Sequence, residues 1–180
     1  MSVDKKEIIQ AMRNDPEQGL RQLMSIYMQS IYWHIRRMVG VHEDAEDATQ
    51  ETFLRVFRSF SQYDEGNSLQ TWLFRIATNE ALRILGRRSG KEMASLDDVS
   101  SEVLMLKEDE WFDSGDELAV KLQQAIHTLP AKQQTTFNLR YYDELSYADI
   151  AEITGSTVGA AKANYHVAKE KIIQYMNYND

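Results

Sequence analysis

Residues Tyr147 to Lys171 read YADIAEITGSTVGAAKANYHVAKEK, a pattern typical of a short helix, a three-residue turn and a second helix. Ser146 is suited to cap the first helix, with Asp149 in the capping-box position three residues later. Gly155 supplies a tight turn at little steric cost. A helix-turn-helix unit of this kind presents its second helix to the major groove of DNA, which is wide enough to admit one helix.

The second helix of this unit divides into two faces. Its outer face carries side chains able to donate to bases and phosphates, including Lys162, Asn164 and Lys169. The pattern alone does not establish DNA binding, because many all-helical proteins contain capped helix pairs without binding DNA. Apolar residues recur at spacings of three and four, as one buried stripe requires: Val158, Ala161, Tyr165, Ala168 and Ile172.

The composition narrows the class of protein. The chain has 180 residues and no cysteine, which excludes disulfides, thiolate zinc sites and cysteine nucleophiles. Its first residues carry no apolar run of signal-peptide type, and no stretch is apolar for long enough to cross a bilayer. We therefore expect a cytoplasmic protein with no direct membrane insertion.

The acidic charge is concentrated in one segment. The net charge is −8, yet residues 92–117 alone hold ten acidic residues and one basic residue. The parts before and after this segment are close to neutral. The acidic net charge is therefore no evidence against DNA binding by the rest of the chain.

Apolar periodicity and capping residues predict an all-α protein. Long helices are expected from Pro16 to about Val39, from about His42 to Phe60, and from Ser68 to about Arg88. The acidic stretch lacks sustained periodicity and reads as a linker, after which Ser114 to Glu117 forms a capping box that restarts a helix. The predicted architecture is two small helical domains, residues 1–90 and 116–180, joined by an acidic linker, residues 91–115, with the helix-turn-helix in the second domain.

Three separate blocks occur in a fixed order along the chain. They are DAEDATQETFLRVFRSF at Asp44–Phe60, TWLFRIATNEALRILGRR at Thr71–Arg88 and LPAKQQTTFNLRYYDELSYADIAEITGSTVGAAK at Leu129–Lys162. With these blocks the chain resembles the small two-domain bacterial sigma factors of the extracytoplasmic-function group, over nearly its whole length.

The resemblance implies a dissociable subunit that binds the RNA polymerase core and directs promoter-specific transcription initiation. The first domain would dock on the polymerase, recognise the proximal promoter element and help melt DNA, and the second would read the distal element. The implied partners are polymerase core, promoter DNA both as duplex and as melted single strand, and an anti-sigma factor. Because the basic stretch at residues 75–91 can neutralise at most about five phosphates and the acidic segment opposes even that, we expect the isolated chain to bind promoter DNA weakly.

The second expected helix opens with five acidic residues and no basic residue between them. A solvated helix start is one explanation, because acidic side chains suit the positive end of the helix dipole. The resemblance implies instead that this surface docks on the coiled coil of the largest polymerase subunit, for which acidic residues beside an exposed apolar one are suitable. The implied polymerase-binding residues are Asp44, Asp47, Gln50, Glu51 and Leu54.

The polar loop at residues 61–68 and the helix that follows are candidates for the proximal element. In similar sigma factors this loop receives an unstacked base, and stacking on an aromatic ring contributes about 1–3 kcal/mol. For Trp72, ordinary core packing is an equally open explanation. Residues 75–91 hold five basic residues and one acidic residue, which fits phosphate contact. The implied residues are Tyr63, Asn67, Ser68, Trp72, Arg75, Asn79, Arg83, Arg87 and Arg88.

The second helix of the helix-turn-helix unit would read the distal element. Many relatives have arginine where this chain has Lys162, Asn164 and Val167. Lysine does not offer the arginine fork to guanine, and asparagine favours adenine, so the resemblance does not predict the promoter sequence. The implied residues are Thr157, Gly159, Lys162, Ala163, Asn164, His166 and Lys169.

Two other functions fit the sequence less well. A stand-alone helix-turn-helix regulator is the main alternative, but it needs its own dimer interface and a more basic DNA face. An enzyme is disfavoured because the four histidines are scattered and no phosphate-binding glycine loop or nucleophile motif is present. We expect no cofactor and no metal. The acidic linker is either a solubilising tether or a mimic of nucleic-acid phosphates inside the polymerase channels.

Overall fold

The computed structural model describes residues 4–97 and 116–178, and every regular element in these two parts is helical. The predicted all-α class is confirmed. The elements are α1 (Lys5–Asn14), α2 (Pro16–Val39), α3 (His42–Ser59), a 3₁₀ turn η1 (Phe60–Gln62), α4 (Leu69–Arg88), α6 (Glu117–His127), α7 (Ala131–Tyr141), α8 (Tyr147–Thr154) and α9 (Val158–Tyr178).

Local capping chemistry sets the helix boundaries in the first half of the chain. The Asp15 side chain accepts a hydrogen bond from Gln18 N, and Pro16 occupies the first turn of α2. Gly40 ends α2 in the left-handed region at φ 78°. Ser68 accepts from Thr71 N and begins α4. These boundaries agree with the sequence prediction, whereas helix α1 was not predicted.

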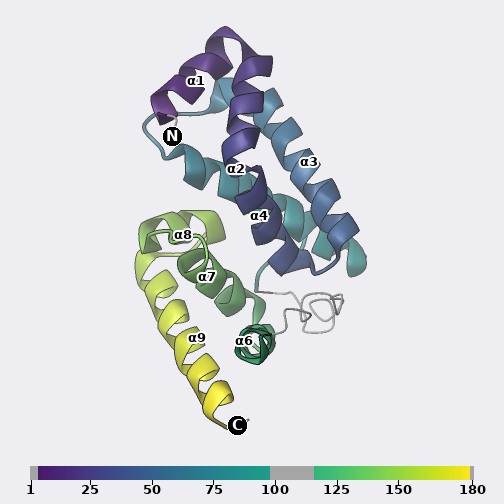
Figure 1. Cartoon of the computed structure of the whole chain (residues 1–180), viewed down its shortest axis with the longest axis vertical. Helices are drawn as coiled ribbons and strands as arrows, with labels where there is room; N and C mark the ends of the chain where they lie inside the picture. The colour runs from purple at the N-terminus through teal and green to yellow at the C-terminus, as the bar shows by residue number, and fades with distance from the viewer. Residues whose placement is uncertain (1–3, 98–115, 179–180) are drawn as a thin grey trace.

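Helices α2, α3 and α4 pack against one another around a buried apolar cluster (Figure 1). The cluster includes Ile31, Ile35 and Phe74, all of which are fully buried. His34 lies inside it with Nε2 2.8 Å from Thr78 Oγ1. Burial and the nearby guanidinium of Arg37 lower the pKa of His34 to about 3, so the ring is neutral at physiological pH.

The start of the predicted linker is part of the first domain's surface. Ala94 N donates to Leu82 O at 2.9 Å, and Ala94 and Leu96 are buried against the α4 region. A Cβ on Gly86 would lie 2.7 Å from Ala94 N, so the segment approaches α4 closely. The rest of the predicted linker, with Ser114 and Gly115 of the predicted capping box, lies outside the described residues. The structure gives Asp116 as the N-cap of α6.

Helices α6 to α9 form a second helical unit with its own apolar cluster, which includes Ala125, Phe137 and Ile172. Ala161, Ala168 and Ile172 of the predicted stripe on α9 are buried, and Tyr165 is half-buried. Val158, in contrast, is 53% exposed. The apolar periodicity of a sequence predicts which face of a helix is buried, but not where along the helix burial begins. In α9 burial begins at Ala161.

The crossing of α1 over α2 depends on a glycine. A Cβ on Gly19 would lie 2.4 Å from Met12 N and 2.5 Å from Met12 Cα, both in the backbone of α1. We expect Gly19→Ala to lower the free energy of unfolding by about 1–3 kcal/mol, because the two backbones must move apart. Urea unfolding of the full chain measures the change.

Gly159→Ala is the matched control, since Gly159 is also helical and a Cβ there meets no heavy atom within 4 Å. This variant should be up to about 1 kcal/mol more stable than the parent chain, because alanine favours the helix over glycine. Equal effects of the two substitutions would contradict the close approach at Gly19.

Candidate nucleic-acid and polymerase interfaces

The helix-turn-helix geometry is present at α8 and α9. Ser146 Oγ accepts a hydrogen bond from Asp149 N at 3.1 Å and donates one to Asp149 Oδ2 at 2.7 Å. The serine hydroxyl therefore makes both hydrogen bonds of the N-terminal cap of α8. Gly155 ends α8 in the left-handed region at φ 67°. Thr157 then caps α9 by accepting from Ala160 N at 3.0 Å. The predicted turn chemistry is therefore confirmed.

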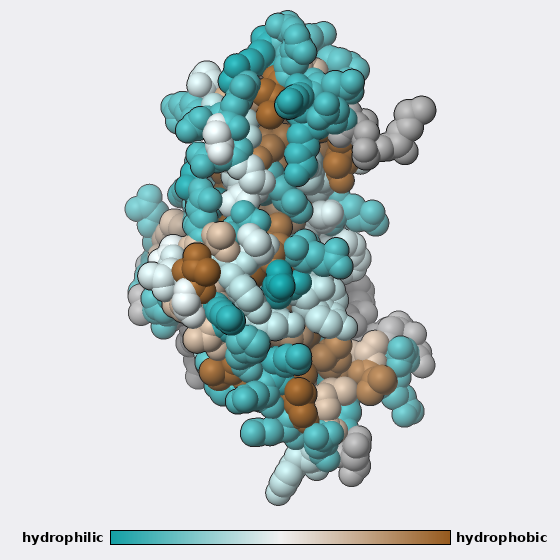
Figure 2. Space-filling model, turned by 90° about the vertical axis from the view of Figure 1, so that its left-hand side faces the viewer, coloured by the Kyte–Doolittle hydropathy of each residue, from teal (hydrophilic) through white to brown (hydrophobic). Residues whose placement is uncertain are grey.

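The outer face of α9 is open to solvent. Six of the seven residues predicted to read the distal element are exposed, and Asn164 is half-buried. Among the described residues, no ion pair engages Lys162 or Lys169, so both ammonium groups are available to an external anion. Figure 2 shows the side of the molecule on the left of Figure 1, where hydrophilic residues predominate around separate apolar patches. The exposed residues are Thr157, Gly159, Lys162, Ala163, His166 and Lys169.

The loop before α4 is held by its own aromatic residue. Tyr63 is 5% exposed, and its hydroxyl donates to Asn67 O at 2.6 Å. Its ring centroid lies 5.0 Å from that of Trp72, which is half-buried. Asn67 and Ser68 are exposed. The structure thus places Tyr63 as a support of the loop, while Trp72 both packs on it and keeps an accessible edge.

The basic residues of α4 do not share one face. Arg75 forms an ion pair with Glu152 of α8 at 3.8 Å, and Arg88 forms one with Asp44 of α3 at 2.7 Å. Arg83 and the half-buried Asn79 line a hollow on the side of α4 towards α3, and Arg87 is exposed. Sequence spacing gave the basic character of this helix, but the partners of Arg75 and Arg88 come from distant segments.

The predicted polymerase-docking surface on α3 is exposed on one side of the helix. Asp47, Gln50 and Leu54 are exposed, Leu54 to 45%, and they lie at spacings that bring them to one face. Asp44 and Glu51 are half-buried, and they pair with Arg88 and Arg55 respectively. Asp47, Gln50 and Leu54 therefore form an exposed acidic and apolar strip on α3, and no other part of the described chain buries it.

A groove beside this strip was missed by the sequence analysis. A cavity of about 680 Å³ lies between α2 and α3, and Met28, Trp33, His42 and Gln50 are among its lining residues. Trp33 is 44% exposed. The available signal was Trp33 itself, a large aromatic residue that falls outside the apolar stripe of α2.

The two helical units contact each other through α4 and α8, which lie side by side in Figure 1. Thr71 Oγ1 donates to Asp149 Oδ1 at 3.0 Å. Ile150 and Ala151 of α8 are buried in the same apolar cluster as the core of the first unit. This contact buries Thr71 of α4, while Arg75 at its edge keeps a side chain that is 46% exposed.

A second contact joins α2 to the turn after α7. Arg37 Nη1 lies 4.0 Å from Asp143 Oδ2, and its guanidinium stacks over the ring of Tyr142 at 4.0 Å. Burial raises the pKa of the Asp143 carboxyl from its ordinary 3.8 to about 6, although Arg37 acts in the opposite direction. The desolvation of this carboxyl is therefore not offset by its ion pair.

Neither a metal-binding cluster nor a membrane-spanning helix is found among the described residues. In residues 4–97 and 116–178, no three histidine or acidic side chains lie together in a way that could hold a metal ion. Within the same residues, no helix combines the length and the hydropathy that a membrane span requires.

Two family models match the chain on both sides of the acidic segment. Sigma-70 region 2 matches residues 23–91, and Sigma-70, region 4 matches residues 119–172. The chain is also 32% identical over 178 residues to the ECF RNA polymerase sigma factor SigW of Bacillus subtilis (strain 168), covering 93% of this chain and 94% of that protein. The chain belongs to the extracytoplasmic-function sigma factors. As a member, this sigma factor acts in RNA polymerase-associated transcription initiation, and the family consists of initiation factors rather than enzymes.

Solved structures with low sequence identity share the fold of this sigma factor. CnrH, solved in complex with the cytosolic domain of CnrY, superposes with a TM-score of 0.72 at 15% identity and covers 96% of each chain. The sigma factor RpoE, solved in complex with the anti-sigma factor NepR from Bartonella quintana, gives 0.66 at 21% identity, with 89% of this chain and 98% of that chain covered.

The raised pKa of Asp143 predicts a pH dependence of stability. The folded state holds the Asp143 proton more tightly than the unfolded state, so this contribution is complete below about pH 4 and is lost as the pH rises through 6. Relative to the parent sigma factor, Asp143→Asn should gain about 1 kcal/mol in unfolding free energy when the pH is raised from 5 to 7.5.

Urea unfolding of both proteins at the two pH values measures this gain. Asp97→Asn is the control, because the Asp97 side chain is largely exposed and its ion pair with Lys132 lies at the surface. A constant difference between the parent and Asp143→Asn at pH 5 and pH 7.5 would contradict the burial of a charged carboxyl at this contact.

Proposed function

We propose that this sigma factor directs the polymerase core to promoters by reading two elements and helping to open DNA. Residues 1–90 would serve the core and the proximal element, residues 91–115 would act as the linker, and residues 116–180 would read the distal element. The observation that carries the proposal is the outer face of α9, which is exposed and polar while the inner face is buried. An amphipathic helix so presented suits the major groove.

The proximal element would be met by the loop and by α4. The exposed Asn67 and Ser68 are free to contact an unstacked base, and the accessible edge of Trp72 offers a stacking surface. Tyr63 would act indirectly, because its hydroxyl fixes the loop backbone at Asn67. Asn79 is available for a base edge, and Arg87 is exposed for a phosphate.

The polymerase core would bind the α3 strip. Leu54 provides an apolar anchor, and Asp47 and Gln50 provide polar contacts around it, which is the usual arrangement of a protein interface with an apolar centre and a polar rim. The half-buried Asp44 and Glu51 would hold Arg88 and Arg55 in place beside the strip.

An anti-sigma factor is a further proposed partner. A sigma factor of the same fold has been solved with such a protein, the anti-sigma factor NepR of Bartonella quintana. The groove between α2 and α3 offers Met28 and Trp33 as apolar contacts beside the polymerase strip. A partner seated there would cover the strip and so compete with the core.

Reading two elements requires the two helical units to separate. In the described arrangement Arg75 is engaged by Glu152, and Thr71 is buried against Asp149. While α8 lies on α4, Thr71 is closed to a DNA duplex and Arg75 is only partly accessible. Binding to the core would therefore replace the contact between α4 and α8, and the free chain would bind promoter DNA weakly.

Run-off transcription with polymerase core and a promoter library tests the function as a whole. We expect transcripts from a subset of promoters that share two elements, and only when both the sigma factor and the core are present. A gel-shift assay with and without polymerase core distinguishes a sigma factor from a stand-alone regulator. Tight, sequence-specific binding by the purified chain at physiological salt would favour that alternative.

Truncation of the apolar anchor should weaken docking. We expect Leu54→Ala to lower the affinity for the core by about tenfold, because an exposed leucine at the centre of an interface contributes more than 1 kcal/mol. Leu118→Ala is the matched control, since Leu118 is 67% exposed but lies on α6. Fluorescence anisotropy of labelled sigma factor with core measures both. Equal affinities of the two variants would remove α3 as the docking site.

Removal of a basic side chain from α9 should affect the distal element alone. We expect Lys162→Ala to weaken the complex of holoenzyme and promoter several-fold, because a contact to DNA contributes about 1 kcal/mol or more. Lys171→Ala is the control, since Lys171 lies further along α9 and pairs with Gln133. Promoters with a scrambled distal element should lose sensitivity to Lys162→Ala. Undiminished sensitivity would contradict the assignment.

A further inference from the structure

Helix α1 lies beside the loop that precedes α4, although the two are far apart in the sequence (Figure 1). Ile8 and Met12 anchor the helix, since both are buried in the apolar cluster of the first unit. The close backbone crossing at Gly19 holds it against α2. The match to Sigma-70 region 2 begins at residue 23, so it does not include α1.

The loop itself is a compact turn. Asn67 N donates a hydrogen bond to Asp64 O at 3.0 Å, and Gly66 N donates one to Asp64 Oδ1 at 2.9 Å. These two bonds close a turn over residues 64–67. The hydroxyl of Tyr63 donates to Asn67 O at 2.6 Å and so braces the far end of the turn.

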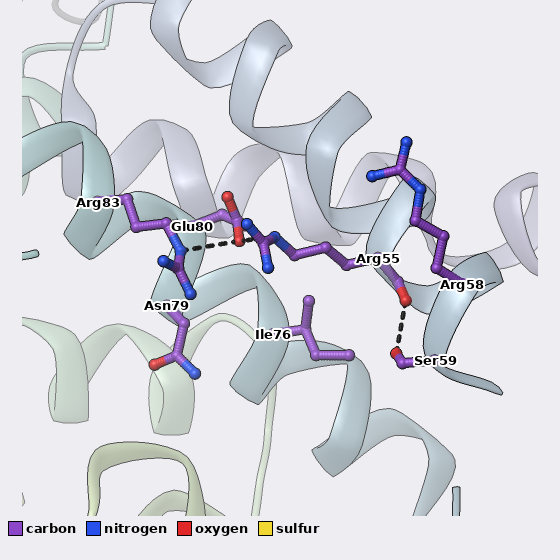
Figure 3. Close-up of a pocket in the computed structure, with 7 residues that line it drawn as sticks. All are labelled: Arg55, Arg58, Ser59, Ile76, Asn79, Glu80 and Arg83. Carbon is purple, nitrogen blue, oxygen red and sulfur yellow. Dashed lines mark hydrogen bonds and ion pairs between the residues drawn. The ribbon is translucent and has the colours of Figure 1, made fainter. Parts of the chain in front are cut away.

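Both ends of the loop are fixed to the helices of the first unit. Helix α3 ends at Ser59, whose hydroxyl donates to Arg55 O at 2.5 Å (Figure 3). The ring centroid of Tyr63 then lies 5.5 Å from that of Phe60 and 5.0 Å from that of Trp72 in α4. Only the tip of the turn projects beyond this aromatic packing and needs support from elsewhere.

Helix α1 supplies a contact to the tip. Arg13 Nη1 lies 2.8 Å from Glu65 Oε1, and Glu65 is the second residue of the turn. Burial raises the pKa of the Tyr63 hydroxyl, the carboxylates of Glu65 and Asp64 raise it further, and Arg13 acts in the opposite direction. The guanidinium of Arg13 is therefore close enough to act on the hydroxyl that braces the turn as well as on its tip.

The ion pair contributes little to the stability of the fold, because 53% of the Arg13 side chain and 52% of the Glu65 side chain are exposed. Its effect is local. Asp64 and Glu65 place two carboxylates shortly before Asn67 and Ser68, the exposed residues proposed to meet an unstacked base. Arg13 offsets the charge of Glu65 where a DNA strand would approach, and it fixes the direction of the turn.

We propose that α1 positions the base-reading loop, and that Arg13 acts on promoter selection through Glu65 rather than by touching DNA. The inference rests on the proposed function, in which this loop holds an unstacked base of the proximal element. A loop held in one conformation before binding loses less conformational freedom on binding, and it distinguishes better between bases. Arg13 is then a positioning residue, and the property that it sets is selectivity at the captured base.

A direct phosphate contact by Arg13 would behave differently. Such a contact carries no sequence information, so its loss would weaken binding to every sequence alike and lower the salt slope by about one. Loss of a positioning residue changes the ratio of affinities for the right and the wrong base. Its effect also depends on Glu65, because Arg13 has nothing to act through once that carboxylate is removed.

The decisive experiment measures the binding of holoenzyme to two single-stranded oligonucleotides that contain the proximal element. One carries the base that run-off transcription selects at the captured position, and the other carries a substituted base. Arg13→Ala should lower the ratio of the two affinities several-fold, whereas Arg13→Lys should retain most of it, because lysine can still pair with Glu65. Lys6→Ala is the matched control, since it removes an exposed cation from the same helix, and it should leave the ratio unchanged.

Glu65→Gln completes a double-mutant cycle. It should lower the ratio as Arg13→Ala does, and the double substitution should be no worse than either single one. Additive losses, or equal weakening for both oligonucleotides with the ratio unchanged, would overturn the proposal. Thermal unfolding should give nearly the same midpoint for all variants, since the pair is exposed. A large fall in the midpoint would make Arg13 a support of the whole unit and would also contradict the proposal.

A measurement on the free full chain separates this proposal from the proposed function. The amides of Gly66 and Asn67 donate within the turn, so Arg13→Ala should speed their hydrogen exchange in ¹H–¹⁵N spectra, and Lys6→Ala should not. Unchanged exchange in Arg13→Ala would contradict positioning by α1, whether or not the core binds. Faster exchange in a chain that fails to bind the core would contradict only the proposed function.

Discussion

Helix α4 is the element on which the rest of this structure depends, because it must satisfy three sets of neighbours at once. Its apolar side packs on α2 and α3, where Phe74 is fully buried. Its second side meets α8 through Thr71 and Arg75. The remaining edge, from Trp72 to Arg83, stays accessible. A single helix therefore sets the core of the first unit, the contact with the second unit and the accessible edge that we propose for DNA.

The distribution of charge follows from the same constraint. Acidic side chains on α3 and α8 pair with basic residues of α4, as in Asp44 with the half-buried Arg88 and Glu152 with the exposed Arg75. Where α4 faces the hollow, one buried carboxylate, Glu80, is shared between two arginines. Arg83 at the hollow and the exposed Arg87 remain accessible on α4, so a chain of net charge −8 still carries local positive charge on this helix.

Sequence reasoning succeeded where the cause is local and failed where it is tertiary. The starts of α2, α4 and α8 follow from Asp15, Ser68 and Ser146, because a cap acts within one helical turn. The burial of Tyr63 and the exposure of Trp33 depend on what lies opposite them in space. The partners of Arg75 and Arg88 lie on other helices, so spacing within α4 could not reveal which basic residues remain available.

The contact between α4 and α8 exists in the free sigma factor, and we propose that it is given up on the promoter. The chain contains no cysteine, so Asn14→Cys and Gln174→Cys introduce a unique pair of spin labels at exposed positions on α1 and α9. Because α1 and the C-terminal end of α9 lie at opposite ends of the molecule (Figure 1), electron–electron distance measurements should give one long, narrow distribution for the free chain and a different distribution in the complex with core and promoter. The same distribution in both states would contradict the loss of this contact.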